Sequence, residues 1–271
     1  MTRLAVIGNP VAHSRSPDIH GAFALQAGLD VRYVKILAPL EGFAETVTSF
    51  VRDGGYGFNV TVPFKHDAFT MCDEVSDIAR QSKTVNTVTV MEDARLRGDN
   101  TDGFGLIRDI EHNQGWKIGG KRILLLGAGG AISGVLPDLI QVRPASIHIF
   151  NRTHEKAERL QALHGGVVQA KRYEELEAAY DIIVSGTSAG LSGEQVALPP
   201  SVIGGRSRCY DMIYGADATP FNRWAMEQGC TECSDGLGML IEQASAAFDI
   251  WFKFKPDTRP VIRALRAALS Q

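Results

Sequence analysis

Short apolar runs alternate with longer segments of mixed polarity through the middle of the chain. The clearest run is I-L-L-L at residues 123–126, which a glycine-rich turn follows at once. An unbroken apolar run of this length is typical of a strand that is buried on both faces of a parallel sheet. We predict further strands at residues 146–150, 167–170, 181–184 and 208–212, and helices at 131–141, 154–164, 173–179 and 219–228. This alternation predicts an α/β domain.

The first third of the chain shows a second alternation of the same kind. Strands are predicted at residues 4–7, 33–37 and 56–62, with a hairpin over 87–97, and helices at 17–28, 40–52, 77–82 and 104–112. Ser16 is expected to cap the first helix, with Pro17 at its first position. The glycine-rich stretch 115–120 suits a boundary between domains, and residues 234–238 precede a long apolar helix and a last one from Pro256.

Bulk composition narrows the classes of partner. The 271 residues are 44% hydrophobic and 22% charged, with a formal net charge of −3. This balance gives no reason to expect nucleic acid or an anionic membrane as a partner. No apolar run reaches the length of a transmembrane helix, and residues 1–11 do not resemble a signal peptide, so we expect a cytoplasmic protein.

Four cysteines are present, and two of them form a lone C-x-x-C motif at Cys230 and Cys233. A zinc site would need two further ligands, and no histidine follows His164. A redox pair usually opens a helix, whereas this pair precedes a Ser-Asp-Gly segment. We therefore expect reduced thiols and no metal site.

The glycine turn after residues 123–126 is a candidate phosphate-binding site. Gly127, Gly129 and Gly130 stand between a predicted strand and a predicted helix, where glycines let the backbone approach a pyrophosphate and helix N–H groups bind it. The usual third glycine of G-x-G-x-x-G would fall at Ile132; here Gly134 follows, and we expect it to allow close packing of the helix on the sheet. An ordinary tight turn is the alternative.

The end of the next predicted strand indicates which dinucleotide would bind. An NAD-binding protein usually carries an acidic residue about twenty residues past the glycines. This chain has Asn151, Arg152 and Thr153 there, with Lys156 one helical turn further. Two cations and two small polar groups suit a 2′-phosphate, which predicts NADP. A solvated basic strand end is the alternative.

Two charged residues are candidates for acid–base chemistry. Reducing a carbonyl with NADPH requires a proton donor within hydrogen-bond reach of the oxygen. Lys65 follows a predicted strand and Asp102 precedes the predicted nucleotide domain, so both are candidates for a cleft between the domains. Considered alone, two charges so far apart in sequence are more often independent surface groups.

Eight short segments have distinctive residue patterns and follow one another in a distinctive order. They are G-N-P-V-A-H-S-R-S-P (8–17), N-V-T-V-P-F-K (59–65), V-N-T (85–87), G-D-N-T-D-G (98–103), G-A-G-G-A (127–131), N-R-T (151–153), D-M-I-Y (211–214) and D-G-L-G-M-L-x-x-Q (235–243). In this order they resemble the NADP-dependent bacterial shikimate dehydrogenases, and the resemblance covers nearly the whole chain.

The resemblance implies the reversible reduction of 3-dehydroshikimate to shikimate by NADPH, on the route to chorismate and the aromatic amino acids. It implies Lys65 as the acid/base residue, with Asp102 holding it and a substrate hydroxyl. The other implied substrate-binding residues are Ser14, Ser16 and Tyr214 for the carboxylate, and Thr61, Asn86 and Gln243 for the ring hydroxyls. The implied cofactor-binding residues are Gly127, Ala128, Gly129, Gly130 and Ala131 for the pyrophosphate, Asn151, Arg152, Thr153 and Lys156 for the 2′-phosphate end, and Asp77, Met212 and Gly236 by the nicotinamide half.

With this resemblance we expect two α/β domains: a substrate domain of residues 1–102 completed by the C-terminal helices 236–271, and a Rossmann-type, parallel-sheet NADP domain of residues 103–235. His13, His20 and Asn59 are expected to be structural. The chain departs from the family at Ser133, where an arginine is common, which removes one cation near the cofactor phosphates. The small-molecule partner is expected to bind a monomer or a homodimer.

Two alternatives remain open. A broader quinate/shikimate dehydrogenase that uses NAD would want an acidic residue near 151–154, and N-R-T-H supplies none. A non-catalytic NADP-binding regulator of the same fold would most easily have lost Lys65 or Asp102, and both are present.

Overall fold

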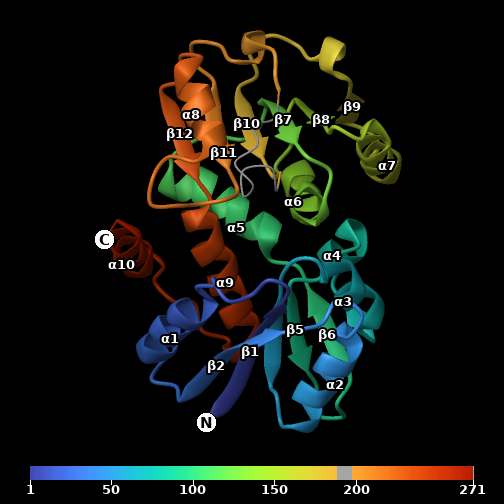
Figure 1. Cartoon of the computed structure of the whole chain (residues 1–271), viewed down its shortest axis with the longest axis vertical. Coiled ribbons are helices and arrows are strands. Elements are labelled where there is room, and N and C mark those ends of the chain that lie inside the picture. Colours follow the sequence, from blue (N-terminus) through green and yellow to red (C-terminus); the bar gives the residue numbers. More distant parts are fainter. Residues whose placement is uncertain (188–196, 271) are drawn as a thin grey trace.

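The computed structural model describes residues 1–187 and 197–270. The chain forms two sheets, each covered by helices, and two helices run between them (Figure 1). The N-terminal sheet and its helices occupy the lower half of the view and the second sheet the upper half. This arrangement confirms the expected two α/β domains.

The N-terminal sheet is mixed rather than parallel throughout. Its strands are β1 (Thr2–Gly8), β2 (Val31–Leu37), β3 (Gly57–Val60), β4 (Glu74–Val75), β5 (Thr87–Val90) and β6 (Leu96–Asp99), in the order β2-β1-β3-β5-β6-β4. β1 pairs in parallel with β2 and β3, whereas β5 is antiparallel to both β3 and β6. The predicted hairpin is therefore present, as the β5–β6 pair.

Helices cover both faces of this sheet, because alternate side chains of each strand point to opposite sides. Ala5 and Ile7 of β1 face a core that includes residues of α2 (Phe43–Arg52) and α3 (Lys65–Met71). Leu4 faces the other side and packs with Trp251 of α9 (Leu237–Phe252). The elements that pack beside α9 on that side are α1 (Ser16–Ala27) and α10 (Arg259–Leu269).

The second sheet is parallel along its whole width. Its strands are β7 (Arg122–Leu126), β8 (Ser146–Phe150), β9 (Val168–Lys171), β10 (Ile182–Ser185), β11 (Arg208–Asp211) and β12 (Glu232–Asp235), in the order β12-β11-β10-β7-β8-β9. The order reverses between β7 and β10, which is the Rossmann arrangement, and ligands of such sheets bind at that reversal beyond the carboxyl ends of the strands.

Two hydrophobic cores enclose this sheet. Ile123 and Leu125 of β7 face the core that includes α6 (Gly130–Gln141) and α7 (His154–His164). Leu124 and Leu126 face the opposite core, which includes residues of α8 (Pro220–Glu227). All four side chains are buried, so the unbroken apolar run reflects burial on both faces.

Helices α5 and α9 connect the two halves. α5 (Asp102–Arg108) continues as a π-helix (Asp109–Asn113) and packs against both α9 and α6. α9 contributes Met239 to the core of the second domain and Trp251 to that of the first. The short helix α4 (Asp77–Ser82) packs against α6 as a further contact between the halves.

Three local predictions were wrong. Ser16 is the first residue of α1 rather than its cap; Arg15 occupies the cap position and makes no side-chain capping bond. The helix predicted at 173–179 is one 3₁₀ turn, Tyr173–Glu175, because this polar segment has too few apolar residues to pack a helix on the sheet. Residues 232–235, where no strand was predicted, form the edge strand β12.

A second 3₁₀ turn lies at Pro200–Val202. Residues 188–196, which follow β10 in sequence, lie outside the described residues. Within residues 1–187 and 197–270, no helix is both long enough and apolar enough to span a bilayer.

Candidate active site

An ion pair between Lys65 and Asp102 lies where the two halves of the molecule meet. Lys65 begins α3, just after the turn that contains the cis Val62–Pro63 peptide bond, and Asp102 begins α5. The lysine Nζ donates to the aspartate Oδ2 at 2.5 Å, and the two side chains are 17% and 7% exposed. The structure therefore joins the two candidate acid–base residues in a largely buried pair.

Further hydrogen bonds fix the orientation of the Asp102 carboxylate. Its second oxygen, Oδ1, accepts from Asn86 Nδ2 at 2.8 Å. The backbone N–H of Asp102 donates to Asn100 Oδ1 at 2.9 Å, and the Asn100 amide in turn donates to Thr84 Oγ1 at 2.8 Å. A carboxylate held on both oxygens has little freedom to leave the lysine.

Asn86 connects this pair to α9. Its Nδ2 donates to Gln243 Oε1 at 3.2 Å and to Thr101 Oγ1 at 2.9 Å, while its Oδ1 accepts from the Thr101 backbone N–H at 2.9 Å. Gln243 Nε2 donates to the Leu240 carbonyl at 2.7 Å. Two amides expected to bind a substrate thus bind each other, beside the Lys65–Asp102 pair.

A second polar group lies between α1 and the first sheet. Ser14 Oγ donates to Ser16 Oγ at 3.2 Å. Tyr33 donates its hydroxyl to Asn59 Oδ1 at 2.7 Å, and Asn59 Nδ2 donates to the Asn86 carbonyl at 3.1 Å. The hydrogen bonds from Tyr33 through Asn59 to Asn86 therefore connect β2, across β1, with β3 and the residue before β5.

His20 is enclosed by aromatic side chains rather than facing a cleft. It is fully buried, and its ring stacks on that of Tyr33 with 4.6 Å between centroids. Burial lowers the pKa of His20 to about 3. A neutral, enclosed imidazole agrees with the expected structural role.

Thr61 and Tyr214 approach this region from the two halves of the chain. Thr61 follows β3 and donates its backbone N–H to the Ile7 carbonyl at 3.0 Å, with its side chain against Gly8, where a Cβ would collide. Tyr214 follows β11 and packs beside the core that contains Ile19 of α1. Burial raises the pKa of Tyr214, and the charge of Arg15 opposes that shift.

The glycine turn after β7 fits a pyrophosphate. Gly127 has φ +104°, a conformation that favours glycine, and its N–H donates to the Phe150 carbonyl at 2.8 Å. Gly129 caps α6 without a side chain, and space is open at the Cβ positions of Gly129 and Gly130. The first N–H groups of α6 are thus accessible to a phosphate.

Close packing around α6 differs from the expectation. Ile132, at the usual third-glycine position, is fully buried beneath Gly186, where a Cβ would collide with the isoleucine side chain. Gly134 packs against the turn before α5 rather than against the sheet: its Cβ would lie 2.9 Å from Asp102 Oδ2 and 3.1 Å from Asn100 Nδ2. The predicted helix–sheet role of Gly134 was wrong, and Gly134 instead brings α6 close to the carboxylate.

The basic segment after β8 lies beside the glycine turn, since β7 and β8 are paired neighbours. Asn151 Nδ2 donates to the Thr153 carbonyl at 2.7 Å. Arg152, Thr153 and Lys156 are exposed, and neither cation has an ion pair within residues 1–187 and 197–270. These free cations fit the 2′-phosphate of NADP.

Two of the three residues expected near the nicotinamide are in contact. Met212 donates its N–H to the Ser185 carbonyl at 2.8 Å, and the backbone of Gly236 lies so close to the Met212 carbonyl that a Cβ would collide. Asp77 is exposed at the start of α4, on the other side of α6 from the sheet. Ser133, which replaces a common arginine, donates its hydroxyl to the Ser82 carbonyl at 2.7 Å and so joins α6 to α4.

The three family models that match this chain all describe shikimate dehydrogenases. Residues 6–88 match the shikimate dehydrogenase substrate binding domain, residues 110–192 the shikimate/quinate 5-dehydrogenase domain, and residues 236–266 the shikimate 5′-dehydrogenase C-terminal domain. This chain belongs to the shikimate dehydrogenase family. Its relatives include a curated shikimate dehydrogenase (NADP(+)) of Hahella chejuensis, 51% identical over 268 residues, which cover 98% of this chain and 99% of that protein.

Two solved structures share the fold over nearly the whole chain. An Ael1 enzyme from Pseudomonas putida is 42% identical, with a TM-score of 0.91 and 98% of each chain covered. The shikimate dehydrogenase of Thermus thermophilus, solved in complex with NADP(H) and shikimate, is 32% identical, with a TM-score of 0.90, and the match covers 99% of this chain and 100% of that one.

Sequence reasoning did not single out several residues of the polar network. Asn100 and Thr101 lie inside the G-D-N-T-D-G segment, and their small polar side chains before a helix were an available signal. Tyr33 gave no such signal, because a tyrosine in a strand is ordinary. Its contact with Asn59 depends on how β1 spaces β2 from β3.

A further carboxylate, Asp138 of α6, lies close to this site. A Cβ on Gly103 would collide with it, and one of its oxygens is buried without a hydrogen-bond partner among the described residues. Burial, and then the charge of Asp102, raise the pKa of Asp138 to about 6. The native state thus holds this proton at pH values where an unfolded aspartate has lost it.

We expect Asp138→Asn to gain stability relative to the wild type as the pH rises from 4 to 7. The native pKa lies above the unfolded value, so wild-type stability falls across this window, and an amide abolishes that loss. Urea unfolding at pH 4, 5, 6 and 7 measures the difference. Glu92→Gln, at an exposed hairpin position, is the matched control; the same pH trend in both variants would contradict this account.

Proposed function

We propose that this chain catalyses the reversible, NADPH-dependent reduction of 3-dehydroshikimate to shikimate. The observation that carries the proposal is the buried Lys65–Asp102 pair, which lies against α6 at Gly134. The names of relatives that span nearly the whole chain, shikimate dehydrogenase (NADP(+)), agree with it.

NADPH, when bound, supplies the hydride for the carbonyl carbon. Lys65 supplies the proton to the carbonyl oxygen and takes it back in the reverse direction. Asp102 holds the ammonium in place and accepts a hydrogen bond from a neighbouring substrate hydroxyl. Asn86 and Asn100 keep the carboxylate in that position. Since the pair is largely buried, its charges are poorly screened by water.

The substrate carries a carboxylate and several hydroxyls, and the polar groups around the pair suit both. Ser14, Ser16 and Tyr214 donate hydroxyl hydrogens to the carboxylate. Thr61, Asn86 and Gln243 bind the ring hydroxyls, since hydroxyl and amide groups both donate and accept. The present Asn86–Gln243 hydrogen bond, at 3.2 Å, is long enough to be exchanged for bonds to a hydroxyl at little cost.

The cofactor roles follow the same geometry. The segment Gly127, Ala128, Gly129, Gly130 and Ala131 binds the pyrophosphate at the start of α6. Asn151, Arg152, Thr153 and Lys156 bind the 2′-phosphate end. Met212 and Gly236 lie by the nicotinamide half, and Asp77 of α4 joins them when the halves close. We place the domain boundaries at residues 102/103, after the first residue of α5, and 235/236, just before α9.

An absorbance assay at the nicotinamide band tests this function directly. With shikimate, we expect reduction of NADP⁺ in preference to NAD⁺, because the exposed cations Arg152 and Lys156 can pair with a 2′-phosphate that NAD⁺ lacks. Comparable rates with quinate and NAD⁺ would instead support the broader quinate/shikimate dehydrogenase. Absence of turnover, with NADP⁺ binding intact by fluorescence titration, would support the non-catalytic regulator.

Replacing Lys65 with alanine should lower kcat by about 100- to 10,000-fold, the usual contribution of general acid–base catalysis. The KM for shikimate should change much less, because the proton transfer is made only in the transition state. Lys117→Ala, at an exposed position, is the control and should retain wild-type rates. A wild-type kcat for Lys65→Ala would remove this lysine from the mechanism.

Replacing Arg152 with alanine should raise the KM for NADP⁺ about tenfold, which corresponds to about 1.4 kcal/mol of binding free energy. The KM for NAD⁺ should stay the same, because NAD⁺ lacks the 2′-phosphate. Arg159→Ala removes an exposed arginine from α7, the helix that follows Arg152, and should leave both constants unchanged. An equal rise for both cofactors would place Arg152 elsewhere.

A further inference from the structure

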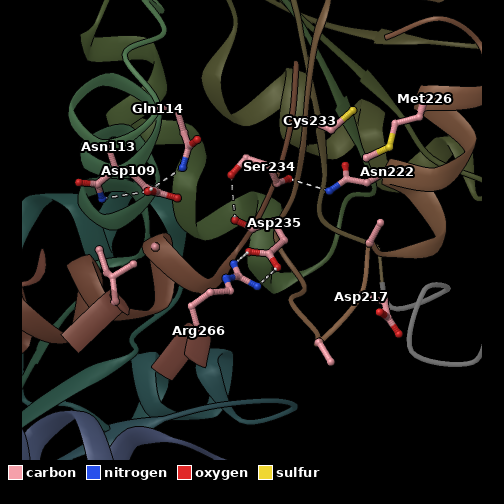
Figure 2. A pocket seen from close by; sticks show the side chains of 14 residues that line it. Asp109, Asn113, Gln114, Asp217, Asn222, Met226, Cys233, Ser234, Asp235 and Arg266 are labelled. Carbon is pink, nitrogen blue, oxygen red and sulfur yellow. Dashed lines mark hydrogen bonds and ion pairs between the residues drawn. The ribbon is translucent and has the colours of Figure 1, made fainter. Parts of the chain in front are cut away.

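The loop that carries Met212 and Tyr214 has an open hollow behind it. This β11–α8 loop, residues 212–219, connects β11 to α8. Residues Ala216, Asp217 and Ala218 form one wall of a hollow of about 430 Å³, and residues Cys233–Asp235 of β12 form another (Figure 2). Because the middle of the loop borders this hollow instead of a packed core, polar contacts must hold it in place.

Arg266, from the C-terminal helix α10, lines the hollow and forms hydrogen bonds with both the β11–α8 loop and β12. Its Nη1 donates to the Gly215 carbonyl at 3.1 Å and to Asp235 Oδ2 at 2.8 Å, and its Nη2 donates to Asp235 Oδ1. The two dashed lines between Arg266 and Asp235 show this forked contact (Figure 2). A planar guanidinium suits this geometry, because it pairs with both carboxylate oxygens and retains a donor for a carbonyl.

Each group that Arg266 binds is next in sequence to a residue with a proposed role. Gly215 directly follows Tyr214, the proposed donor to the substrate carboxylate. Asp235 directly precedes Gly236, whose N–H donates to the Ile213 carbonyl at 2.9 Å and whose backbone packs tightly on the Met212 carbonyl. One side chain thus connects the substrate side of the loop with its cofactor side.

We propose that Arg266 is a positioning residue for this reaction, which sets the β11–α8 loop and the start of α9 so that Tyr214, Met212 and Gly236 reach their ligands together. Arg266 touches neither ligand; it acts through Gly215 and Asp235. This inference rests on the proposed function, and it adds the C-terminal helix to the elements that shape the site. The Arg266 side chain is 43% exposed and that of Asp235 is 11% exposed, so the effect is moderate rather than decisive for folding.

Steady-state kinetics of the full-length protein test the inference. In Arg266→Ala we expect the KM values for both shikimate and NADP⁺ to rise about five- to tenfold, with kcat changed less than threefold. Arg266→Lys keeps the charge but loses the fork, and should lie between the wild type and the alanine variant. Asp235→Asn should resemble Arg266→Ala, and the double variant should be no worse than either single variant, because both remove one contact.

The matched control is Arg263→Ala, which removes an exposed arginine one turn earlier on α10 and should have wild-type kinetics. Hydrogen exchange supplies a readout besides activity. Amides of residues 213–218 should exchange faster in Arg266→Ala, and also in Arg266→Gln, whose side chain is shorter and uncharged. The exchange of β7 amides should not change. If Arg266→Ala melts too low to assay, Arg266→Gln replaces it in the kinetic comparison.

The outcomes separate this inference from the function on which it rests. A wild-type protein without shikimate oxidation would overturn the proposed function. A wild-type protein that is active, together with Arg266 variants that keep wild-type KM values and loop exchange, would overturn the positioning role alone. A uniform loss of kcat and of protection throughout the chain would also overturn it, because that result indicates a general effect on folding.

Discussion

The Asp102 carboxylate contacts groups from several elements, and these contacts determine how the elements around the site are arranged. Asp102 begins α5, receives the Lys65 ammonium and the Asn86 amide on its two oxygens, and has Gly134 of α6 packed against it. A side chain at position 134 would push α6 away from the ion pair. The site therefore depends on close approach as much as on charge, because the Lys65–Asp102 pair and α6 meet in one contact at Gly134.

This contact explains why the helices at the junction are arranged as they are. α5 packs against both α6 and α9. α5 and α9 are so close at Gly105 that a side chain there would collide with Gln243. Gln243 thereby reaches Asn86 from the far end of the sequence. Residues of the first, middle and last parts of the chain meet because small residues let three helices approach one another.

The sequence predicted most of the fold and the proposed site, and the failures have physical causes. β8, α4 and α7 lie where they were predicted. The residues that indicate each of these elements are close together in sequence, so a short stretch is enough to predict it. The edge strand β12 was missed, since a strand paired on one side only need not carry an apolar run. The sequence also could not show that Asn86 and Gln243 bind each other or that Gly134 abuts Asp102, because both contacts arise between elements that are distant in sequence.

The place of α9 in the chain has a consequence for synthesis. The face of the N-terminal sheet that bears Leu4 is covered by Ala247 and Trp251, and Trp251 Nε1 also donates to the Val88 carbonyl at 3.1 Å. Those residues of α9 are translated long after the strands of the sheet that they cover. Until α9 has been made, this face of the nascent first sheet stays apolar and exposed, so strands made early become native only after a much later helix packs on them.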